Sequence, residues 1–415
     1  MIADQTPEGA TPSRWRAARD RVPVAIGVIV TVLFLNNLAG ASVRPLLPVY
    51  VERELGLSPA FSGLLLGVES LVGGMVSLAA GAVADAVGHR RVLIAGFAGF
   101  TFGLLQFTTH QPWLMVVLAV LYGMAHGLRS TAGQSYLLTA ASAGSVGVAT
   151  AAYFLGGTLG QAAGSAVAGP AIETWGFAPF ALIAIGMNLV PLVIAARFLP
   201  TLPRAASAHR SLHPGEMLAI VRRRELLLLG GLRFFPTAFW GVWSLVIPLL
   251  LFRATESIVL TALYSTTGLV LSSISQFVVG RWSDRHGRKI PTLIFLGLQA
   301  LAPVVAAGFT GYPAVLFGTG VVGMASGWTM SVLVLGAVRD RTQPHERGRA
   351  VGFIHTLWSL GLFVGSASAG LLLDLHASIP LAMAVGFSLV AIALAVALYR
   401  RAPTDMGLAV GQSLT

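Results

Sequence analysis

One acidic residue, Glu69, lies well inside a long apolar run that spans about residues 60–84. It is about nine residues from the end of that run, or roughly 14 Å at 1.5 Å per helical residue. A charge at such a depth costs on the order of 3 kcal/mol in hydrocarbon, so the residue usually faces a cavity or a partner. Removal from water favours the protonated carboxyl, which can then take up and release protons. Two roles are open: coupling of protons or binding of a substrate cation, and a structural bond between helices.

Basic side chains occur inside two other apolar runs. His126 and Arg129 are three positions apart and fall on one helical face. Arg129 can also extend its guanidinium to the membrane surface, whereas a packed, hydrogen-bonded state is expected for His126. Arg233 lies about 10 Å inside its run, where it can bind an anionic substrate group, pair with an acid or reach the surface in the same way.

A short polar stretch occurs twice, and corresponding residues of the two copies are 199 positions apart. Each copy reads Gly-x-x-x-Asp-x-x-Gly followed by basic residues, and apolar runs flank it on both sides. This pattern predicts a tight turn between two membrane helices, with glycine permitting positive φ and Asp pairing with arginines or helix amides. The residues concerned are Gly81, Asp85, Gly88, Arg90 and Arg91 in the first copy and Gly280, Asp284, Gly287, Arg288 and Lys289 in the second.

The repeated stretch resembles the loop between helices 2 and 3 of the major facilitator superfamily, with its echo between helices 8 and 9. The resemblance implies an all-α polytopic membrane protein whose 12 transmembrane helices form two pseudo-symmetric six-helix bundles. It also implies that both copies gate a conformational change. In this family, helix 4 carries an Arg-x-x-x-Gly pattern linked to proton transfer, and Arg129 to Gly133 is similar, with Ala132 where Gln is usual. We therefore expect Glu69, Arg129 and His126 to take part in proton coupling.

One further stretch resembles the antiporters of this family. Gly156, Gly160 and Gly164 are similar to their Gly-x-x-x-Gly-Pro-x-x-Gly-Gly stretch, with Gln161 in place of proline. Small residues at this spacing also allow close helix packing in any membrane bundle. Gly361 and Gly365 repeat the pattern 205 positions later, which supports duplicated halves.

In the superfamily, helices 1, 4, 7 and 10 line the central cavity. This implies that the substrate cavity is lined by residues on the corresponding apolar runs. The candidates are Asn36, Asn37, Arg233, Trp240, Trp243 and Trp328.

Composition limits the class of protein. The chain has 415 residues, of which 55% are hydrophobic and 10% charged, against about 25% charged in soluble domains. Repeated apolar runs of this length predict membrane-spanning helices. The chain has no Cys, and its one lysine, Lys289, is not part of a phosphate-binding Gly-x-x-x-x-Gly-Lys-Ser/Thr motif. We therefore expect no catalytic residues, no bound metal and no cofactor.

The apolar runs divide the chain into segments. We predict an N-terminal segment at 1–21, a first six-helix bundle at 22–198, a linker at 199–223, a second bundle at 224–399 and a tail at 400–415. The helices are expected at about 22–43, 60–84, 92–109, 112–138, 146–170, 178–198, 226–251, 257–279, 290–309, 313–337, 350–373 and 379–399. Pro45 and Pro48 should kink or stop the first helix.

The basic residues predict the orientation. With the N-terminus inside, 22 of the 27 Lys and Arg residues fall on the cytoplasmic side and 3, including Arg44, outside. We therefore expect a bacterial cytoplasmic (inner) membrane protein with both termini in the cytoplasm. The net charge of +11 is then a topology signal, and no nucleic-acid partner is expected.

These features together predict a secondary active transporter that works by alternating access. The Pro45-x-x-Pro48 ending resembles that of the twelve-helix drug:proton antiporters, which favours proton-coupled efflux of a hydrophobic or amphipathic small molecule. The expected partners are this substrate, protons and the lipid bilayer, with the chain as a monomer. The alternatives are proton-coupled uptake of a polar metabolite and, less favoured, a non-transporting receptor or scaffold. A membrane enzyme is disfavoured because catalytic motifs are missing.

Overall fold

The computed structural model describes residues 12–40, 43–140, 146–201, 223–343 and 347–400, and within these ranges the regular secondary structure is helical throughout, with short connecting turns. Eleven spans in these ranges are long and apolar enough to cross a membrane. One further helix, α7, is 30 residues long, rich in glycine and alanine, and lies among them. The predicted all-α polytopic architecture is thereby confirmed.

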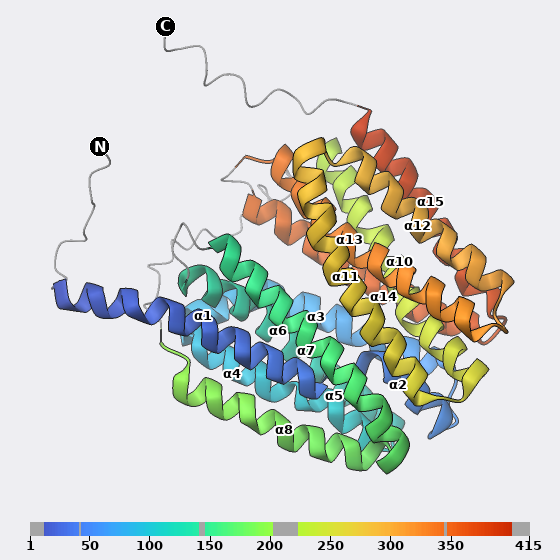
Figure 1. Cartoon of the computed structure of the whole chain (residues 1–415), viewed down its shortest axis with the longest axis horizontal. Helices are drawn as coiled ribbons and strands as arrows, with labels where there is room; N and C mark the ends of the chain where they lie inside the picture. The colour runs from blue at the N-terminus through green and yellow to red at the C-terminus, as the bar shows by residue number, and fades with distance from the viewer. Residues whose placement is uncertain (1–11, 41–42, 141–145, 202–222, 344–346, 401–415) are drawn as a thin grey trace, which may run out of the picture.

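The N-terminal half forms one bundle (Figure 1). Its first span is divided into the helices α1 and α2, and its third span consists of the short helices α4, α5 and η1. The elements are α1 (Pro12–Gly40), α2 (Val43–Arg53), α3 (Pro59–Val87), α4 (His89–Gly99), α5 (Thr101–Leu105), the 3₁₀ helix η1 (Gln106–Thr108), α6 (Pro112–Ala140), α7 (Val146–Trp175) and α8 (Phe177–Phe198).

The C-terminal half forms the second bundle from six uninterrupted helices (Figure 1). These are α10 (Arg224–Thr255), α11 (Ile258–His286), α12 (Lys289–Gly308), α13 (Pro313–Arg341), α14 (Arg347–Leu373) and α15 (Ser378–Tyr399).

The glycine pairs bring corresponding helices of the two halves into close contact. A side chain at Gly160 of α7 would overlap the backbone of Phe34 on α1, and one at Gly365 of α14 would overlap the backbone of Ala238 on α10. The fifth and eleventh spans therefore pack on the first and seventh in the same way. This matched contact is the pseudo-symmetry that the 205-residue repeat predicts.

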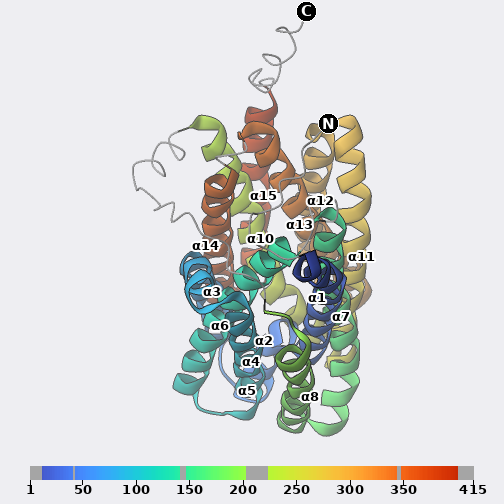
Figure 2. The same cartoon turned by 90° about the vertical axis from the view of Figure 1, so that its left-hand side faces the viewer.

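The two bundles meet along α3 and α14 and along α7 and α11. Gly63 of α3 lies against the backbone at Ser366 of α14, and Gly169 of α7 against Val259 of α11. These contacts lie near the start of α3 and α11. We call this side the far end, and the opposite side, which carries Gly88 and Gly287, the motif end. Figure 1 shows the bundles close together at the far end and diverging toward the motif end, where α1 begins and α15 ends, and the start of α1 faces the viewer in Figure 2.

The first span differs from its prediction. The span does not end at Pro45 and Pro48, because α1 ends at Gly40, before both prolines, and a second helix, α2, contains them and runs to Arg53. Pro45 is in the first turn, where its missing N–H removes no helical bond. The span predicted to end at about Val43 therefore extends ten residues further as a second helix, and Arg44 lies within the span and not outside it. At its other end, α1 begins at Pro12, before the predicted Val22.

The repeated stretches also differ from a simple turn. Most of each copy belongs to a helix, since α3 runs to Val87 and α11 to His286. The turns themselves are short: Gly88, with φ 106°, separates α3 from α4, and Gly287, with φ 83°, together with Arg288 separates α11 from α12. Only glycine adopts this region of φ and ψ without strain, which explains one glycine of each copy.

Candidate functional site

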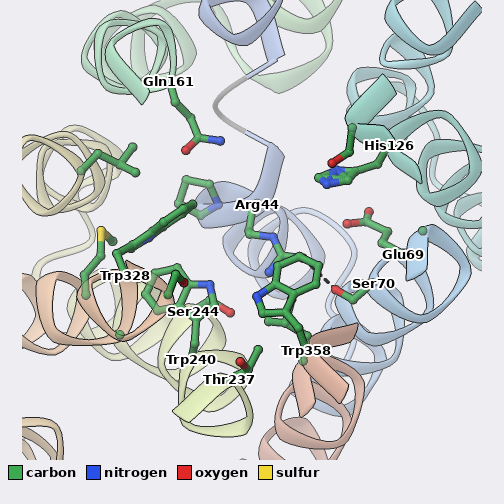
Figure 3. Close-up of a pocket in the computed structure, with 18 of the residues that line it drawn as sticks. Arg44, Glu69, Ser70, His126, Gln161, Thr237, Trp240, Ser244, Trp328 and Trp358 are labelled. Atoms are coloured by element: carbon green, nitrogen blue, oxygen red, sulfur yellow. Dashed lines mark hydrogen bonds between the residues drawn. The ribbon is translucent and has the colours of Figure 1, made fainter. Parts of the chain in front are cut away.

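A central cavity of about 190 Å³ lies between the two bundles. Figure 3 shows side chains of both halves pointing into it. α2, α3 and α6 contribute charged and polar side chains, whereas α10, α13 and α14 contribute three tryptophans.

Glu69 borders this cavity from α3 and is 3% exposed. Its Oε1 accepts a hydrogen bond of 2.9 Å from Gln106 Nε2 on η1. Its Oε2 is buried and has no hydrogen-bond partner among the described residues. A half-satisfied buried carboxyl is costly, so this oxygen is suited to bind a proton or a cationic group that enters the cavity.

Glycines of α6 allow the helix to approach Glu69. A Cβ at Gly123 would lie 2.6 Å from the carbonyl oxygen of Glu69, and Gly127 similarly lies against the backbone of Gly73. The close contact between α3 and α6 places Glu69 and His126 at one side of the cavity (Figure 3). His126 is half-buried, and its ring packs edge-on to Tyr122 with 6.5 Å between centroids.

Arg129 is held inside the bundle and does not extend to the membrane surface. Its Nη1 donates to Asn36 Oδ1 at 2.7 Å and to Asn37 Oδ1 at 3.2 Å. The guanidinium carbon lies 4.1 Å from the ring centroid of Phe100, a favourable cation–π distance. Asn36 also donates to Asn188 Oδ1 at 2.6 Å. Arg129 thus connects α6 to α1 while bordering the cavity, and Asn36 connects α1 to α8.

Asn36 and Asn37 are therefore partners of Arg129 and are themselves absent from the cavity wall. Both are at least nine-tenths buried, and each supplies the oxygen that the buried guanidinium needs.

The tryptophans divide into two groups. Trp240 of α10 and Trp328 of α13 line the cavity, with 6.2 Å between their ring centroids. Trp358 of α14 lines it as well and stacks on His355 at 5.2 Å. Trp243 is fully buried away from the cavity, where it donates to the carbonyl oxygen of Gly320 at 2.9 Å.

Arg233 also lies outside the cavity wall. Its Nη1 donates to Ser331 Oγ on α13 at 2.9 Å. Its guanidinium carbon is 6.0 Å from the ring centroid of Trp358. The structure thus places it as a link between α10 and α13 within the C-terminal bundle.

Arg44 is the cavity residue that sequence reasoning missed. Its Nη2 donates to Ser70 Oγ at 3.0 Å, directly after Glu69 on α3. The two prolines had suggested an outer loop at this position. The signal that would have found it is the second apolar stretch, from Leu46 to Val51, which carries the span on to Arg53. Arg44 is nine residues inside that end, about 13 Å.

At the motif end, the second copy of the repeated stretch forms a network of ion pairs. Arg288 binds Asp284 at 2.9 Å and Asp340 of α13 at 2.7 Å. In the first copy, Arg90 donates to the carbonyl oxygen of Ala196 on α8. The side chain of Asp85 lies outside the described part of the structure. In the described residues, these contacts join helices of one bundle to each other.

Comparison with known proteins gives the family. The family model of the Major Facilitator Superfamily matches residues 29–271 and 237–413, which together cover most of the chain. The chain belongs to the major facilitator superfamily. Its fold and family are those of transporters, and it is an integral membrane protein.

The relatives within the superfamily are distant. An uncharacterized MFS-type transporter of Salmonella typhimurium is 26% identical over 372 residues, covering 83% of this chain and 88% of that one. The class H tetracycline resistance protein of Pasteurella multocida is 33% identical over 127 residues, covering 31% of this chain and 30% of the relative. Matches to other curated transporters span half of their length or less. The crystal structure of the nucleoside transporter NupG superposes with a TM-score of 0.74 at 14% identity, covering 91% of this chain and 100% of that one. This likeness supports the superfamily fold alone.

Proposed function

We propose that this superfamily member is a proton-coupled exporter of hydrophobic or amphipathic small molecules. The observation that carries the proposal is Glu69, a buried carboxyl with one unpartnered oxygen at the edge of a cavity lined by three tryptophans. The tryptophans provide apolar surface for a flat molecule. The carboxyl provides a group that binds either a proton or a polar part of the cargo.

The orientation follows from the basic residues. The positive-inside rule assigns the motif end to the cytoplasm. The described structure, whose bundles diverge toward that end (Figure 1), then faces the cytoplasm. An exporter takes up its cargo in this conformation.

Competition at Glu69 provides the coupling. An ionised Glu69 can hold a positive group of the cargo, and protonation removes that attraction. Because one carboxyl cannot serve both ligands at once, cargo and proton occupy the site alternately, and protons moving inward drive the cargo outward. The driving force is about 2.3 kcal/mol per charge per 100 mV, plus the pH difference.

Two relatives named for drug resistance support this direction, because moving a drug out of the cell is one way to resist it. Both the tetracycline resistance protein of Pasteurella multocida and the multidrug resistance protein 1 of Bacillus subtilis match part of the chain. A riboflavin transporter of Clostridioides difficile also matches 22% of it, so the substrate must be found by experiment.

The test is proton movement in proteoliposomes that contain a pH-sensitive dye. A panel of aromatic amphipathic compounds is added as an outward or inward gradient, and the internal pH is followed. We expect at least one compound to drive protons in the opposite direction to its own movement. Movement of both in the same direction would make the protein a symporter and favour uptake. Binding without any flux would indicate a receptor or scaffold.

A further inference from the structure

The cavity wall is electrically divided between the two bundles. Three charged residues line it, Arg44, Glu69 and Arg129, and all three belong to the N-terminal bundle. The described part of the C-terminal bundle contributes no Asp, Glu, Lys or Arg to the wall, and provides Trp240, Trp328 and Trp358 instead. A cargo held between the bundles therefore meets charge on one side and aromatic rings on the other.

Two of the three charges are available to a ligand. Arg129 is held by Asn36, Asn37 and the ring of Phe100. Arg44 has one described side-chain bond, from Nη2 to Ser70, and its planar guanidinium carries five donors. Among the described residues, Arg44 and Glu69 are not joined by an ion pair, although Ser70 anchors Arg44 directly beside Glu69. Figure 3 shows both side chains reaching into the same cavity.

Unpartnered polar atoms mark both walls. Glu69 Oε2 is buried without a partner on the charged side, and the hydroxyl of Tyr264 is buried without a described partner on the other. Tyr264 is 1% exposed and lines the cavity. Such groups cost free energy when they stay unpaired. They therefore indicate that a polar ligand completes the site.

From this arrangement we propose that the cargo is a flat aromatic molecule with a zwitterionic head. The inference rests on the proposed transport function. Arg44 binds the carboxylate of the head, Glu69 Oε2 binds its ammonium group, and the three tryptophans enclose its aromatic body. An amino-acid-like head on an aromatic body is the smallest chemistry that uses Arg44, Glu69 and the three tryptophans together.

Electrostatics favours a zwitterion over either single charge. A purely cationic cargo is repelled by the positive charges of Arg44 and Arg129. A purely anionic cargo is repelled by the ionised Glu69. A zwitterion pairs with Arg44 and Glu69 together and brings no net charge into the low-dielectric site, where unpaired ions are costly. Its ammonium group still competes with the proton for Glu69, so the coupling proposed above is kept.

The test is equilibrium binding to the purified full-length chain in nanodiscs at pH 7, without any gradient. Tryptophan is compared with its methyl ester, which is a cation, and with N-acetyltryptophan, which is an anion. A larger series on biphenylalanine repeats the comparison. We expect the zwitterion of at least one series to bind at least about tenfold more tightly than both derivatives, since one ion pair of about 1.4 kcal/mol gives that factor. Equal affinities of all three forms in both series would overturn the proposal.

Two variants assign the charges. Arg44→Gln should remove the preference for the zwitterion over the ester, and Glu69→Gln should remove its preference over the N-acetyl form. Matched controls are Arg53→Gln on the same helix α2 and Glu54→Gln beside it, both at the far end and outside the cavity wall. They should bind like the original chain. If Arg44→Gln, folded by its melting temperature, still prefers the zwitterion over the ester, the assignment of Arg44 is wrong.

The failure of this inference differs from the failure of the proposed function. Proton-coupled export of aromatic compounds without any zwitterion preference would leave the function and reject the inference. Zwitterion-selective binding without proton-coupled flux would support the inference and reject the proposed function.

Discussion

Glu52 and Arg253 join the two bundles at the far end through two parallel hydrogen-bonded contacts. Arg253 Nε donates to Glu52 Oε1 at 2.7 Å and Nη2 to Oε2 at 2.6 Å, connecting α2 to α10. Two-pronged contacts of this kind are the strongest geometry for arginine and carboxylate. The far end must separate if the cavity is to open on that side, so the pair favours the present conformation.

Glu52→Gln should therefore shift the protein toward a conformation open at the far end. The pair is partly exposed, and exposed pairs contribute about 1 kcal/mol or less, so the population should change by up to about fivefold. Spin labels at His110 and Leu375, one in each bundle, would show this as a longer distance. Glu54→Gln is the control, because Glu54 pairs with Arg53 of its own bundle. An unchanged distance distribution in Glu52→Gln would show that the pair has no part in the equilibrium.

Glu69→Gln should abolish gradient-driven transport and leave exchange of cargo without a gradient. The amide keeps an oxygen that can accept from Gln106 but cannot titrate. The melting temperature should therefore stay close to that of the original chain, within about 1 kcal/mol of unfolding free energy. Transport and melting are measured on the same preparation. A stable variant with full gradient-driven transport would move the coupling role to another group, and an unstable one with intact coupling would make Glu69 structural.

Gly160→Ala and Gly365→Ala should each destabilise the fold by about 1–3 kcal/mol, because the added carbon meets the backbone of a neighbouring helix. Gly386→Ala on α15 is the matched control, since nothing lies within 4 Å of its added carbon. It should be neutral or slightly stabilising. Thermal unfolding in detergent measures all three, and equal melting temperatures would show that these helices can move apart freely.

Gly88→Ala should be destabilised by about 1–3 kcal/mol for a different reason. Its added carbon would meet no atom within 4 Å, but the residue has a φ of 106°, which alanine adopts only with strain. Gly186→Ala is the control, because Gly186 has equally open surroundings but lies in a helix without a positive φ. A difference between the two variants therefore reports backbone strain and not packing. We expect a lower melting temperature for Gly88→Ala only. The same melting temperature in both would mean that the turn relaxes without cost.

Single cysteines test the orientation, because the chain has no Cys of its own. His110 and His286 are exposed at opposite ends of the molecule. His110→Cys should react with a membrane-impermeant maleimide added to intact cells, and His286→Cys only after the membrane is permeabilised. The reversed pattern would contradict the positive-inside assignment.

Much of the fold was predictable because apolar length and period are local properties. The turn glycines were found from the repeat, since φ values of 106° and 83° at Gly88 and Gly287 require that residue type. Glu69 was found because an acid in an apolar run is rare and costly. These signals need no knowledge of which helices are neighbours.

Other features depend on neighbours and were not predictable. Arg129 could have extended to the surface, and only the packing of α1 against α6 supplies Asn36 and Asn37 as acceptors. Trp240 and Trp243 are three residues apart, yet one faces the cavity and the other a glycine of α13. Arg44 was misplaced because prolines suggested a helix end, whereas the first turn of α2 accommodates Pro45.

The division of charge across the cavity has a mechanical consequence. Since the carboxyl and both arginines of the wall belong to the N-terminal bundle, a proton that binds at Glu69 changes the charge of that bundle alone. The membrane voltage acts on charge, at about 2.3 kcal/mol for each unit moved through 100 mV. Protonation therefore alters the force on one half of the molecule while the other half feels the same field as before. A voltage step should consequently act on the N-terminal bundle with a force that depends on whether Glu69 carries a proton.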